Sequence, residues 1–397
     1  MRVLVITNDF PYASTPQAGI FVLRQIEALS HLGWEIRVLR FIPWAPPLLS
    51  RWKQYREVPI KYSYANIEVS VTRVLLLPRF GMMQYIGSQS HGFVARAISD
   101  FKPDVLHAHQ VIPTGLLAIG HGCPVVVTAH GSDAYDYPYR NNAFQRAAKK
   151  VLSDADTVVA VSRFIATHAE RLGASKVQVV FNGADPTVFF PADRSLARNN
   201  LKIPLDRNVV VYVGYLGEAK GIFDLVNALR QLRELRPVLL VAGSGEQKLA
   251  MGEALRRHNI DHRFFGVLNQ RDVAELVAAS DIVTLPSHRE GLPTTICESM
   301  LSGRAVVATA VGGVPEIVSD RVTGFLVPPK EPAALGVALR DVFLNPHLRD
   351  DIGRKAYDYA SSHLTWSANA AEYDRIFREL VDRRAQKGVK GTPQRAT

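Results

Sequence analysis

Short apolar runs alternate along the chain with segments that repeat apolar residues at helical spacing. Stretches such as Phe21–His31 and Asn142–Leu152 have the spacing of surface helices. The apolar runs of the first half predict β-strands at Val3–Ile6, Glu35–Leu39, Val105–His107, Val125–Thr128, Thr157–Val161 and Val177–Val180. Because strands that alternate with helices form parallel sheets with both faces covered, this half predicts a doubly wound α/β domain.

The alternation stops near Phe190 and resumes after a charged segment with two prolines. We interpret Pro191 to Leu205 as a linker between a first domain at 1–190 and a second domain at 205–365. The second half predicts strands at Val209–Val213, Val238–Val241, Arg263–Phe265, Ile282–Leu285, Ala305–Ala308 and Gly324–Val327. The expected fold is therefore two doubly wound, Rossmann-like domains facing each other across a cleft, with ligands at the carboxyl ends of the strands.

One short pattern occurs in both halves. Asp156 and Asp281 each precede an apolar strand that ends in a serine at the same spacing, Ser162 and Ser287. Asp154-Ala-Asp156 resembles a metal-binding Asp-x-Asp, but the second copy lacks the first aspartate. We therefore interpret both copies as structural junctions.

The composition is that of a soluble globular chain, with 47% apolar and 21% charged residues among 397. It excludes a disordered, collagen-like or disulfide-rich protein. The 47 basic residues exceed the 37 acidic ones by 10, which suits an anionic partner. Cys123 and Cys297 lack disulfide or zinc spacing, which predicts a cytoplasmic protein. No run reaches the ~18 apolar residues of a membrane span, and Val3–Ile6 is too short for a signal peptide.

Basic residues are concentrated in two places. Residues 383–397 carry five basic residues and no acidic one, which predicts a frayed basic tail. Residues 40–80 interleave aromatic residues with the cations Arg40, Arg51, Lys53, Arg56, Lys61, Arg73 and Arg79. Two interpretations stay open for 40–80. It is either a solvated loop and helix anchored by its aromatic residues, or a patch that rests on an anionic membrane surface or grips an acidic acceptor. The second would place the protein at the inner face of the cell membrane.

The densest candidate for chemistry is Ser287-His-Arg-Glu-Gly-Leu-Pro-Thr-Thr-Ile-Cys-Glu-Ser-Met300. Glu290 and Glu298 flank a turn that enters a helix, with Pro293 suited to the first helical position. The N–H groups of Leu292, Thr294 and Thr295 would then be unpaired beside a positive helix end, which suits a phosphate. A glutamate next to that end can accept hydrogen bonds from sugar hydroxyls.

Other candidates follow predicted strands. Gly214, Gly217 and Lys220 follow the first strand of the second half, where the lysine is able to reach a diphosphate. His130 and Gly19 follow strands of the first half and are expected to border the cleft. His107 and His109 have no third ligand at a fitting spacing, so we interpret them as strand-end packing rather than a metal site.

Taken together, these segments resemble the family-4 retaining glycosyltransferases of the two-domain GT-B architecture. The E-x7-E pair and the turn that ends at Gly312-Gly-Val-Pro-Glu-Ile-Val318 carry the most specific match. Weaker matches run through Asp104–His109, His130–Asp133, Asn182–Asp185, Gly214–Gly221 and Gly324–Val327, so the resemblance covers almost the whole chain.

The resemblance implies a role for each matching residue. Lys220 would pair with the donor diphosphate, Glu298 with the ribose and Glu290 with the transferred sugar, which His130 would touch from the other domain. The turn at Val267 and Leu268 would meet the base, and Gly19 and Gly217 would lie near the diphosphate. Asp133 is a further tentative member of the site. The resemblance also implies that a last helix at 366–381 crosses back onto the first domain.

Two positions depart from the family pattern. Tyr215 stands where the family commonly has an arginine, so one diphosphate cation is missing. Arg289 is a candidate to compensate for it. Phe181 replaces a proline, which we expect to affect structure only.

The resulting hypothesis is a retaining hexosyltransferase that uses a nucleotide-sugar donor and a glycan or lipid-linked acceptor in cell-surface polysaccharide assembly. We expect no metal, no other cofactor and no nucleic-acid partner. A nucleotide-sugar epimerase of the same architecture and a non-catalytic binder of anionic polymer or membrane are the alternatives. Neither Lys220 nor Glu290 is expected to lie in a core.

Overall fold

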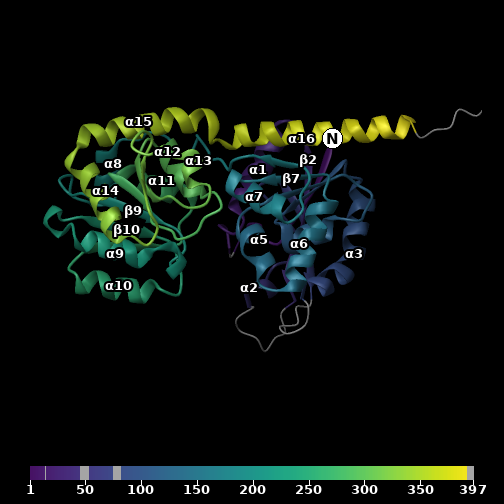
Figure 1. The fold of residues 1–397 in the computed structure, drawn as a ribbon, viewed down its shortest axis with the longest axis horizontal. Helices are drawn as coiled ribbons and strands as arrows, with labels where there is room; N and C mark the ends of the chain where they lie inside the picture. Colours follow the sequence, from purple (N-terminus) through teal and green to yellow (C-terminus); the bar gives the residue numbers. More distant parts are fainter. Residues whose placement is uncertain (14, 45–52, 75–81, 391–397) are drawn as a thin grey trace, which may run out of the picture. The chain divides into compact units, whose positions relative to one another are not determined.

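The computed structural model describes residues 1–13, 15–44, 53–74 and 82–390. The chain forms two compact units (Figure 1). The first unit comprises Met1–Val180 together with the segment from Asn369 on, and the second comprises Phe181–Ala368. Each unit is a Rossmann-like α/β domain with a mostly parallel sheet, so the predicted fold class of the two halves is confirmed.

Within the described ranges, the sheet of the first unit has eight strands in the order β3-β4-β2-β1-β5-β6-β7-β8. All pairs are parallel except β3 with β4. The strands are β1 (Arg2–Thr7), β2 (Glu35–Pro43), β3 (Lys61–Tyr64), β4 (Ile67–Val74), β5 (Val105–His109), β6 (Val125–Ala129), β7 (Thr157–Ala160) and β8 (Val177–Val179). The strands predicted in this half are all present, whereas β3 and β4 were not predicted.

The β3–β4 hairpin changes the interpretation of residues 40–80. Its turn places Ala65 and Asn66 at positive φ, which is the backbone of a tight two-residue hairpin loop. Arg40 is buried, and its guanidinium lies 3.3 Å from the hydroxyl oxygen of Tyr62, which packs against the core. The aromatic anchoring of the first interpretation is therefore present at Tyr62, but Arg40 is buried rather than solvated. Arg51, Arg79 and Trp52, which contributed to the predicted patch, lie outside the described residues.

Helices cover both faces of this sheet. The helix α1 and the last helix, α16, share one core with the faces of β1, β2 and β4. The helix α3 packs on the opposite face of β1, β2 and β4. The helices of this unit are α1 (Ile20–His31), α2 (Lys53–Arg56), α3 (Met82–Phe101), α4 (Leu116–Ala118), α5 (Ser132–Tyr135), α6 (Asn142–Asp154), α7 (Arg163–Arg171) and α16 (Trp366–Lys390). No helix in the described part of the chain is long and apolar enough to span a bilayer.

The helix α16 is longer than the sequence predicted. The Trp34 indole donates to Asp374 at 2.7 Å, and Phe377 packs edge-on against the same indole. The helix continues to Lys390, so the predicted end at 381 and the frayed tail from 383 are wrong up to that residue. Residues 391–397 of the predicted tail lie outside the described residues.

The second unit has a parallel sheet in the order β11-β10-β9-β12-β13-β14. Its strands are β9 (Val209–Val213), β10 (Val238–Ala242), β11 (Asp261–Gly266), β12 (Ile282–Leu285), β13 (Ala305–Thr309) and β14 (Phe325–Val327). Its helices are α8 (Arg194–Asn200), α9 (Ile222–Arg230), α10 (Lys248–Arg257), α11 (Gln270–Ala279), α12 (Thr294–Leu301), α13 (Val314–Ile317), α14 (Pro332–Leu344) and α15 (Pro346–His363). Every strand predicted in this half is present.

The segment interpreted as a linker is instead part of the second unit. It contains α8, and the Arg198 side chain of that helix is buried. The Arg198 guanidinium donates to Asp281 at 2.7 Å and to the carbonyls of Leu205 and Arg207. A charged sequence was mistaken for an exposed one because its charge is paired inside the domain.

The repeated aspartates have the same structural role in both units. Asp156 accepts a hydrogen bond from the Val125 N–H at 2.9 Å, and Asp281 accepts one from the Val209 N–H at 2.8 Å. In each case the aspartate N–H donates back to the carbonyl of the same residue. Each aspartate thus ties the starts of neighbouring strands together, which confirms the interpretation as junctions.

Replacing Asp281 should strongly destabilise the second unit. In Asp281→Ala, the buried Arg198 loses its carboxylate, and so does Arg349, which donates to Asp281 at 2.8 Å. We expect a loss of about 3–5 kcal/mol in the free energy of unfolding, because a buried charge is left unpaired. Urea unfolding followed by circular dichroism measures this loss.

The matched control is Asp261→Ala, which breaks the pair of an exposed carboxylate with Arg207. That variant should lose less than about 1 kcal/mol. Equal unfolding midpoints for the two variants would contradict the role of Asp281.

Candidate active site

The second unit brings Lys220 and Glu290 together across 70 residues of sequence. Lys220 ends a short helical turn after β9, and Glu290 lies in the loop between β12 and α12. The Lys220 Nζ donates to Glu290 Oε1 at 2.7 Å. The glutamate side chain is only 9% exposed and the lysine side chain 31%. The expectation that neither lies in a core is therefore wrong for Glu290, whose buried carboxylate is paired with a partly exposed lysine.

Backbone contacts hold the loops of this pair together. Gly221 follows Lys220 at positive φ, and a Cβ there would lie 1.9 Å from the Pro286 carbonyl oxygen. Gly312, also at positive φ, has the same close approach to the carbonyl oxygen of Glu290. Only glycine fits such contacts. The loops after β9, β12 and β13 therefore meet at one edge of the sheet.

His288 adds two links between the same loops. Its N–H donates to the Ala219 carbonyl at 2.9 Å, and its Nε2 lies 2.7 Å from Asp224 Oδ2. Asp224 lies in the first turn of α9, one turn after Lys220. The imidazole thus fixes the lysine turn relative to the loop that carries Glu290.

The start of α12 offers N–H groups beside this pair. The helix begins at Thr294, one residue later than predicted, and Pro293 is its N-cap without a side-chain hydrogen bond. Among the described residues, the N–H groups of Leu292, Thr294 and Thr295 have no acceptor. The buried Leu292 is held in place through its carbonyl, which accepts from Asn182 at 3.0 Å. Such a helix end suits an anion.

Glu298 lies within α12, half-buried, one turn further along the helix. Val267 and Leu268 follow β11, where the Val267 side chain is 59% exposed. Gly217 lies in the loop after β9, next to the ring of Tyr215. These predicted donor-binding residues therefore belong to loops or helices that follow neighbouring strands of one sheet.

Tyr215 does not present a free hydroxyl to a ligand. Its hydroxyl donates to the Glu246 carboxylate, which raises the pKa of Tyr215 and lowers the pKa of Glu246. Both side chains belong to neighbouring loops, after β9 and β10, and the Tyr215 side chain is 56% exposed. The position of the family arginine thus carries a neutral side chain bound to an anion. Arg289, the proposed compensating cation, is exposed in the loop before α12.

In the first unit, Gly19 and His130 lie at the starts of helical segments. Gly19 caps α1 at positive φ, and a Cβ there would lie 2.3 Å from the carbonyl oxygen of Asp9. The His130 ring packs against Phe21, with 4.8 Å between ring centroids. His130 is also 3.0 Å from His109, Nε2 to Nδ1. The first turn of α1 and the loop after β6 are therefore adjacent.

Asp133 stabilises the turn that carries His130. Its carboxylate accepts from the N–H groups of Val111 at 2.8 Å, Gly131 at 2.7 Å and His130 at 3.1 Å. Burial raises the pKa of Asp133, and these backbone donors oppose that rise. The structure thus assigns this tentative site residue to holding the loop.

The histidines behind His130 form a buried neutral chain. His107 Nε2 lies 2.8 Å from the hydroxyl of Thr128, which is 2.7 Å from the hydroxyl of Tyr373 on α16. Burial lowers the pKa of both His107 and His130 to about 3, and it lowers the pKa of His109 well below its ordinary value. His107 and His109 are packed as predicted. In the described ranges no group of three histidine, cysteine or acidic residues is arranged to hold a metal.

Asp224, His288 and Glu246 were not predicted as parts of the site. His288 stands inside the motif around Glu290, but its partner is 64 residues away and no local spacing points to it. Glu246 is paired with Tyr215 over 31 residues in the same way. Only the strand order, which brings the loops after β10, β9 and β12 together, identifies these partners.

Comparisons with known proteins agree with this architecture. The model of the Glycosyltransferase Family 4 matches residues 18–188, and the model of the Glycosyl transferases group 1 matches residues 193–359. A putative teichuronic acid biosynthesis glycosyltransferase of Bacillus subtilis, TuaC, is 28% identical over 370 residues, 89% of this chain and 92% of that protein. A D-inositol 3-phosphate glycosyltransferase of Kribbella flavida is 30% identical over 299 residues, 68% of this chain and 70% of that protein.

Solved structures show a similar fold. A sucrose-phosphate synthase from Thermosynechococcus elongatus has a TM-score of 0.79 at 22% identity, covering 96% of this chain and 99% of its own. The Anabaena protein HepE in complex with UDP has a TM-score of 0.75 at 21% identity, covering 96% and 100%. At these identities the likeness concerns the fold alone.

The buried histidines should make the stability of the first unit depend on pH. In the unfolded chain their pKa is about 6.5, so below that pH the unfolded state binds more protons than the folded state. Stability is therefore complete above pH 6.5 and is lost as the pH falls toward 3. Between pH 7.5 and 5.5, His107 and His130 should each contribute a loss of about 1.4 kcal/mol, and His109 acts in the same direction.

Urea unfolding at several pH values measures this loss, with His107→Asn as the comparison. The variant should lose about 1.4 kcal/mol less than the wild type over the same interval. Asp133 acts in the opposite sense, because its pKa is raised, and the difference between the two proteins cancels its effect. The same pH dependence in both proteins would contradict a buried, neutral His107.

Proposed function

Because the chain belongs to the glycosyltransferases of family 4 and group 1, we propose that it moves a sugar from a nucleotide-sugar donor to a glycan or lipid-linked acceptor with retention of configuration. The observation that carries the proposal is the Lys220–Glu290 pair beside the unpaired N–H groups of α12. The proposed setting is cell-surface polysaccharide assembly in the cytoplasm. The similarity to TuaC over most of both chains supports that setting.

The donor diphosphate is proposed to bind at Lys220 and at the start of α12. Cleavage of the sugar–phosphate bond leaves negative charge on the nucleoside diphosphate. A fixed ammonium and fixed N–H groups stabilise that charge most when water is excluded. Lys220 is suited to this role because Glu290 and the links of His288 fix its turn. Under this proposal the leaving group needs no metal ion.

The remaining contacts with the nucleotide-sugar are proposed to come from the same loops. Glu290 would accept hydrogen bonds from hydroxyls of the transferred sugar, and Glu298 from the ribose. Backbone at Val267 and Leu268 would meet the base, and Gly217 would let the main chain approach the diphosphate. The strand order supports this assignment, since β11, β10, β9 and β12 are consecutive in the sheet.

His130 and Gly19 are the proposed contribution of the first domain. A histidine with a pKa of about 3 stays neutral at physiological pH and donates a hydrogen bond without carrying charge. The 3.0 Å contact with His109 occupies Nε2 of His130, which leaves Nδ1 for the transferred sugar. As the sugar becomes oxocarbenium-like, a neutral donor avoids repulsion of its positive charge.

The Tyr215–Glu246 pair is expected to weaken binding of the diphosphate. The site lacks one cation there and carries a carboxylate instead, so phosphate binding depends more heavily on Lys220. Arg289 is proposed to supply part of the missing charge from the neighbouring loop. Retention is proposed to proceed by attack on the face from which the leaving phosphate departs, assisted by that phosphate.

A nucleoside diphosphate should stabilise the protein without metal. We expect one of UDP, GDP and ADP to raise the melting temperature in EDTA. At about 100 times its dissociation constant a ligand adds about 2.7 kcal/mol, which corresponds to a rise of several degrees. Thermal unfolding with each nucleotide measures this and identifies the base.

A rise that requires Mg²⁺ would contradict metal-free binding. No rise with any nucleotide, in EDTA or with Mg²⁺, would contradict the donor site and favour a non-catalytic binder.

Loss of the charge of Lys220 or Glu290 should strongly reduce turnover while the fold remains. Lys220→Met and Glu290→Gln should each lower the rate of donor hydrolysis or transfer by about 10²–10³, the effect of losing one fixed charge-stabilising group. Product is measured by NMR with the donor that matches the stabilising nucleotide. The anomer released first should have the configuration of the donor.

Lys220→Met leaves a buried carboxylate unpaired, so the double variant Lys220→Met/Glu290→Gln separates stability from chemistry. It should melt near the wild-type temperature and remain inactive. Exposed controls are Lys149→Met and Glu253→Gln, which should keep full activity. Wild-type activity in the double variant, or conversion of the donor into an epimeric nucleotide-sugar, would overturn the assignment.

A further inference from the structure

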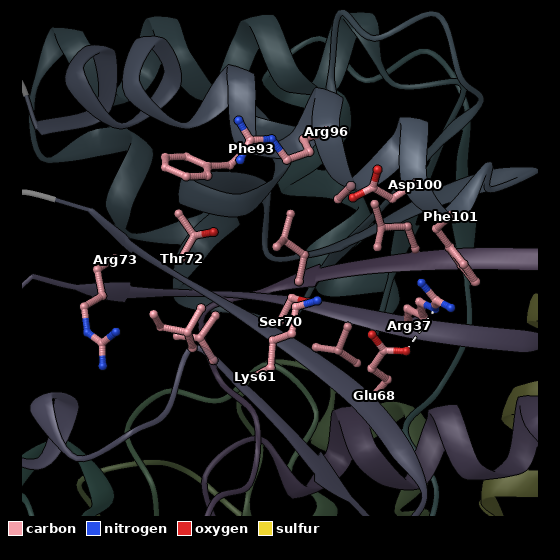
Figure 2. A pocket seen from close by; sticks show the side chains of 16 residues that line it. Arg37, Lys61, Glu68, Ser70, Thr72, Arg73, Phe93, Arg96, Asp100 and Phe101 are labelled. Atoms are coloured by element: carbon pink, nitrogen blue, oxygen red, sulfur yellow. Dashed lines mark ion pairs between the residues drawn. The ribbon is translucent and has the colours of Figure 1, made fainter.

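A cavity of about 550 Å³ lies in the first unit, apart from His130 and Gly19. It is bounded by helix α3 on one side and by strands β1, β2, β3 and β4 on the other. Figure 2 shows Phe93 and Arg96 on the helix, across the cavity from Lys61, Ser70 and Thr72 on the strands. None of these residues belongs to the proposed donor site.

Near the β3 edge of the sheet this face of the cavity carries hydrophilic side chains, whereas Leu4 on β1 and Leu39 on β2 line it with apolar ones. Along β4, Val69 and Val71 belong to the core on the opposite face. Since side chains alternate between faces along a strand, Ser70 and Thr72 point toward the helix. Lys61 on β3 is paired in register with Ser70, so an ammonium and two hydroxyls lie in neighbouring positions.

Some cationic side chains of the cavity already have a partner among the described residues, and others do not. Arg37 pairs with Glu68 at 3.2 Å and lies over the Phe101 ring. Arg73 donates to the Val58 carbonyl. Lys61 and Arg96 are both exposed and form no ion pair with any described residue. Two cations are thus available at the part of the cavity that also carries the hydroxyls.

The opposite end of the cavity has a different character. Figure 2 places Asp100 and Phe101 together with the Arg37–Glu68 pair, away from Phe93. This end offers a carboxylate and a neutralised pair, so an anionic group is favoured only near Lys61 and Arg96. A ligand would therefore bind with its anionic groups toward one end.

An exposed aromatic ring lies at the end of the cavity that carries Lys61 and Arg96. The Phe93 side chain is 47% exposed and lies one turn before Arg96 on the same helix. Pockets that recognise polar small molecules combine apolar contact area with a few convergent polar groups. A phenyl ring suits the C–H face of a sugar ring, hydroxyls suit its hydroxyl groups, and Lys or Arg suits a carboxylate.

We propose that this cavity binds a carboxylate-bearing glycan, with uronate carboxylates held by Lys61 and Arg96 and ring hydroxyls held by Ser70 and Thr72. Under the proposed function, on which this part rests, the glycan is a part of the acceptor or product chain away from its reacting end. A nucleic acid is less suited to the cavity, because Phe101, the second aromatic ring in its lining, is covered by Arg37 and cannot stack on a base.

Titration calorimetry with tetragalacturonate at low ionic strength tests the proposal, and maltotetraose is the neutral counterpart. The wild type should bind tetragalacturonate and not maltotetraose, with affinity that falls as salt is added. Lys61→Gln and Arg96→Gln should each weaken binding about tenfold, as expected for one charged hydrogen bond. Both residues are exposed, so both variants should fold.

The control Lys149→Gln removes an exposed cation from α6, outside the cavity, and should bind like the wild type. Equal loss in this control, equal affinity for maltotetraose, or no binding of tetragalacturonate at millimolar concentration would overturn the proposal. Tighter binding of a short oligothymidylate that is lost in the same two variants would also overturn it.

Nucleotide stabilisation of the same samples separates this inference from the proposed function. A nucleotide effect without glycan binding contradicts the cavity assignment alone. Glycan binding that depends on Lys61 and Arg96, without any nucleotide effect, supports the cavity and contradicts glycosyl transfer.

Discussion

Close contact between main-chain segments at one edge of the second sheet makes the Lys220–Glu290 pair possible. Gly221 and Gly312 let the loops approach to distances that any side chain would prevent, and His288 adds hydrogen bonds between the same loops. A lysine and a largely buried glutamate are thereby held at 2.7 Å beside unpaired N–H groups. Because the loops are fixed before any ligand arrives, charge that develops on a leaving diphosphate meets donors that need no rearrangement.

The fold could be predicted wherever one local property decides the structure. Continuous runs of β-branched and aromatic residues, such as Val209–Val213, are buried strands whatever their neighbours are. Prediction failed where a residue distant in sequence decides the local structure. The charge of Arg198 pointed to a linker until its partner Asp281 was known. The β4 strand alternates apolar and polar residues from Ile67 to Thr72, which is a strand signal, but the surrounding cations are equally typical of an exposed segment.

The candidate site shows the same division. The motif around Glu290, the lysine turn and His130 could be proposed as candidates from sequence, because each lies in a segment that follows a predicted strand. The motifs do not show which contacts hold each group or what its protonation state is. The hydroxyl of Tyr215 is bound to Glu246, Asp133 is bound to main-chain N–H groups, and His107 is bound to the hydroxyl of Thr128. These are properties of contacts between loops, which depend on strand order and on burial.

Asp156 and Asp281 lie at the amino ends of the parallel strands, and the candidate catalytic groups follow their carboxyl ends. Each domain therefore keeps the bonds that secure its sheet at one edge and the groups suited to chemistry at the other. Residues can be substituted in loops such as those that carry Tyr215 and Arg289 without breaking the hydrogen bonds of Asp156 and Asp281. An architecture of this kind lets a lineage change its donor or acceptor by substitution at one edge, while selection for folding acts at the other.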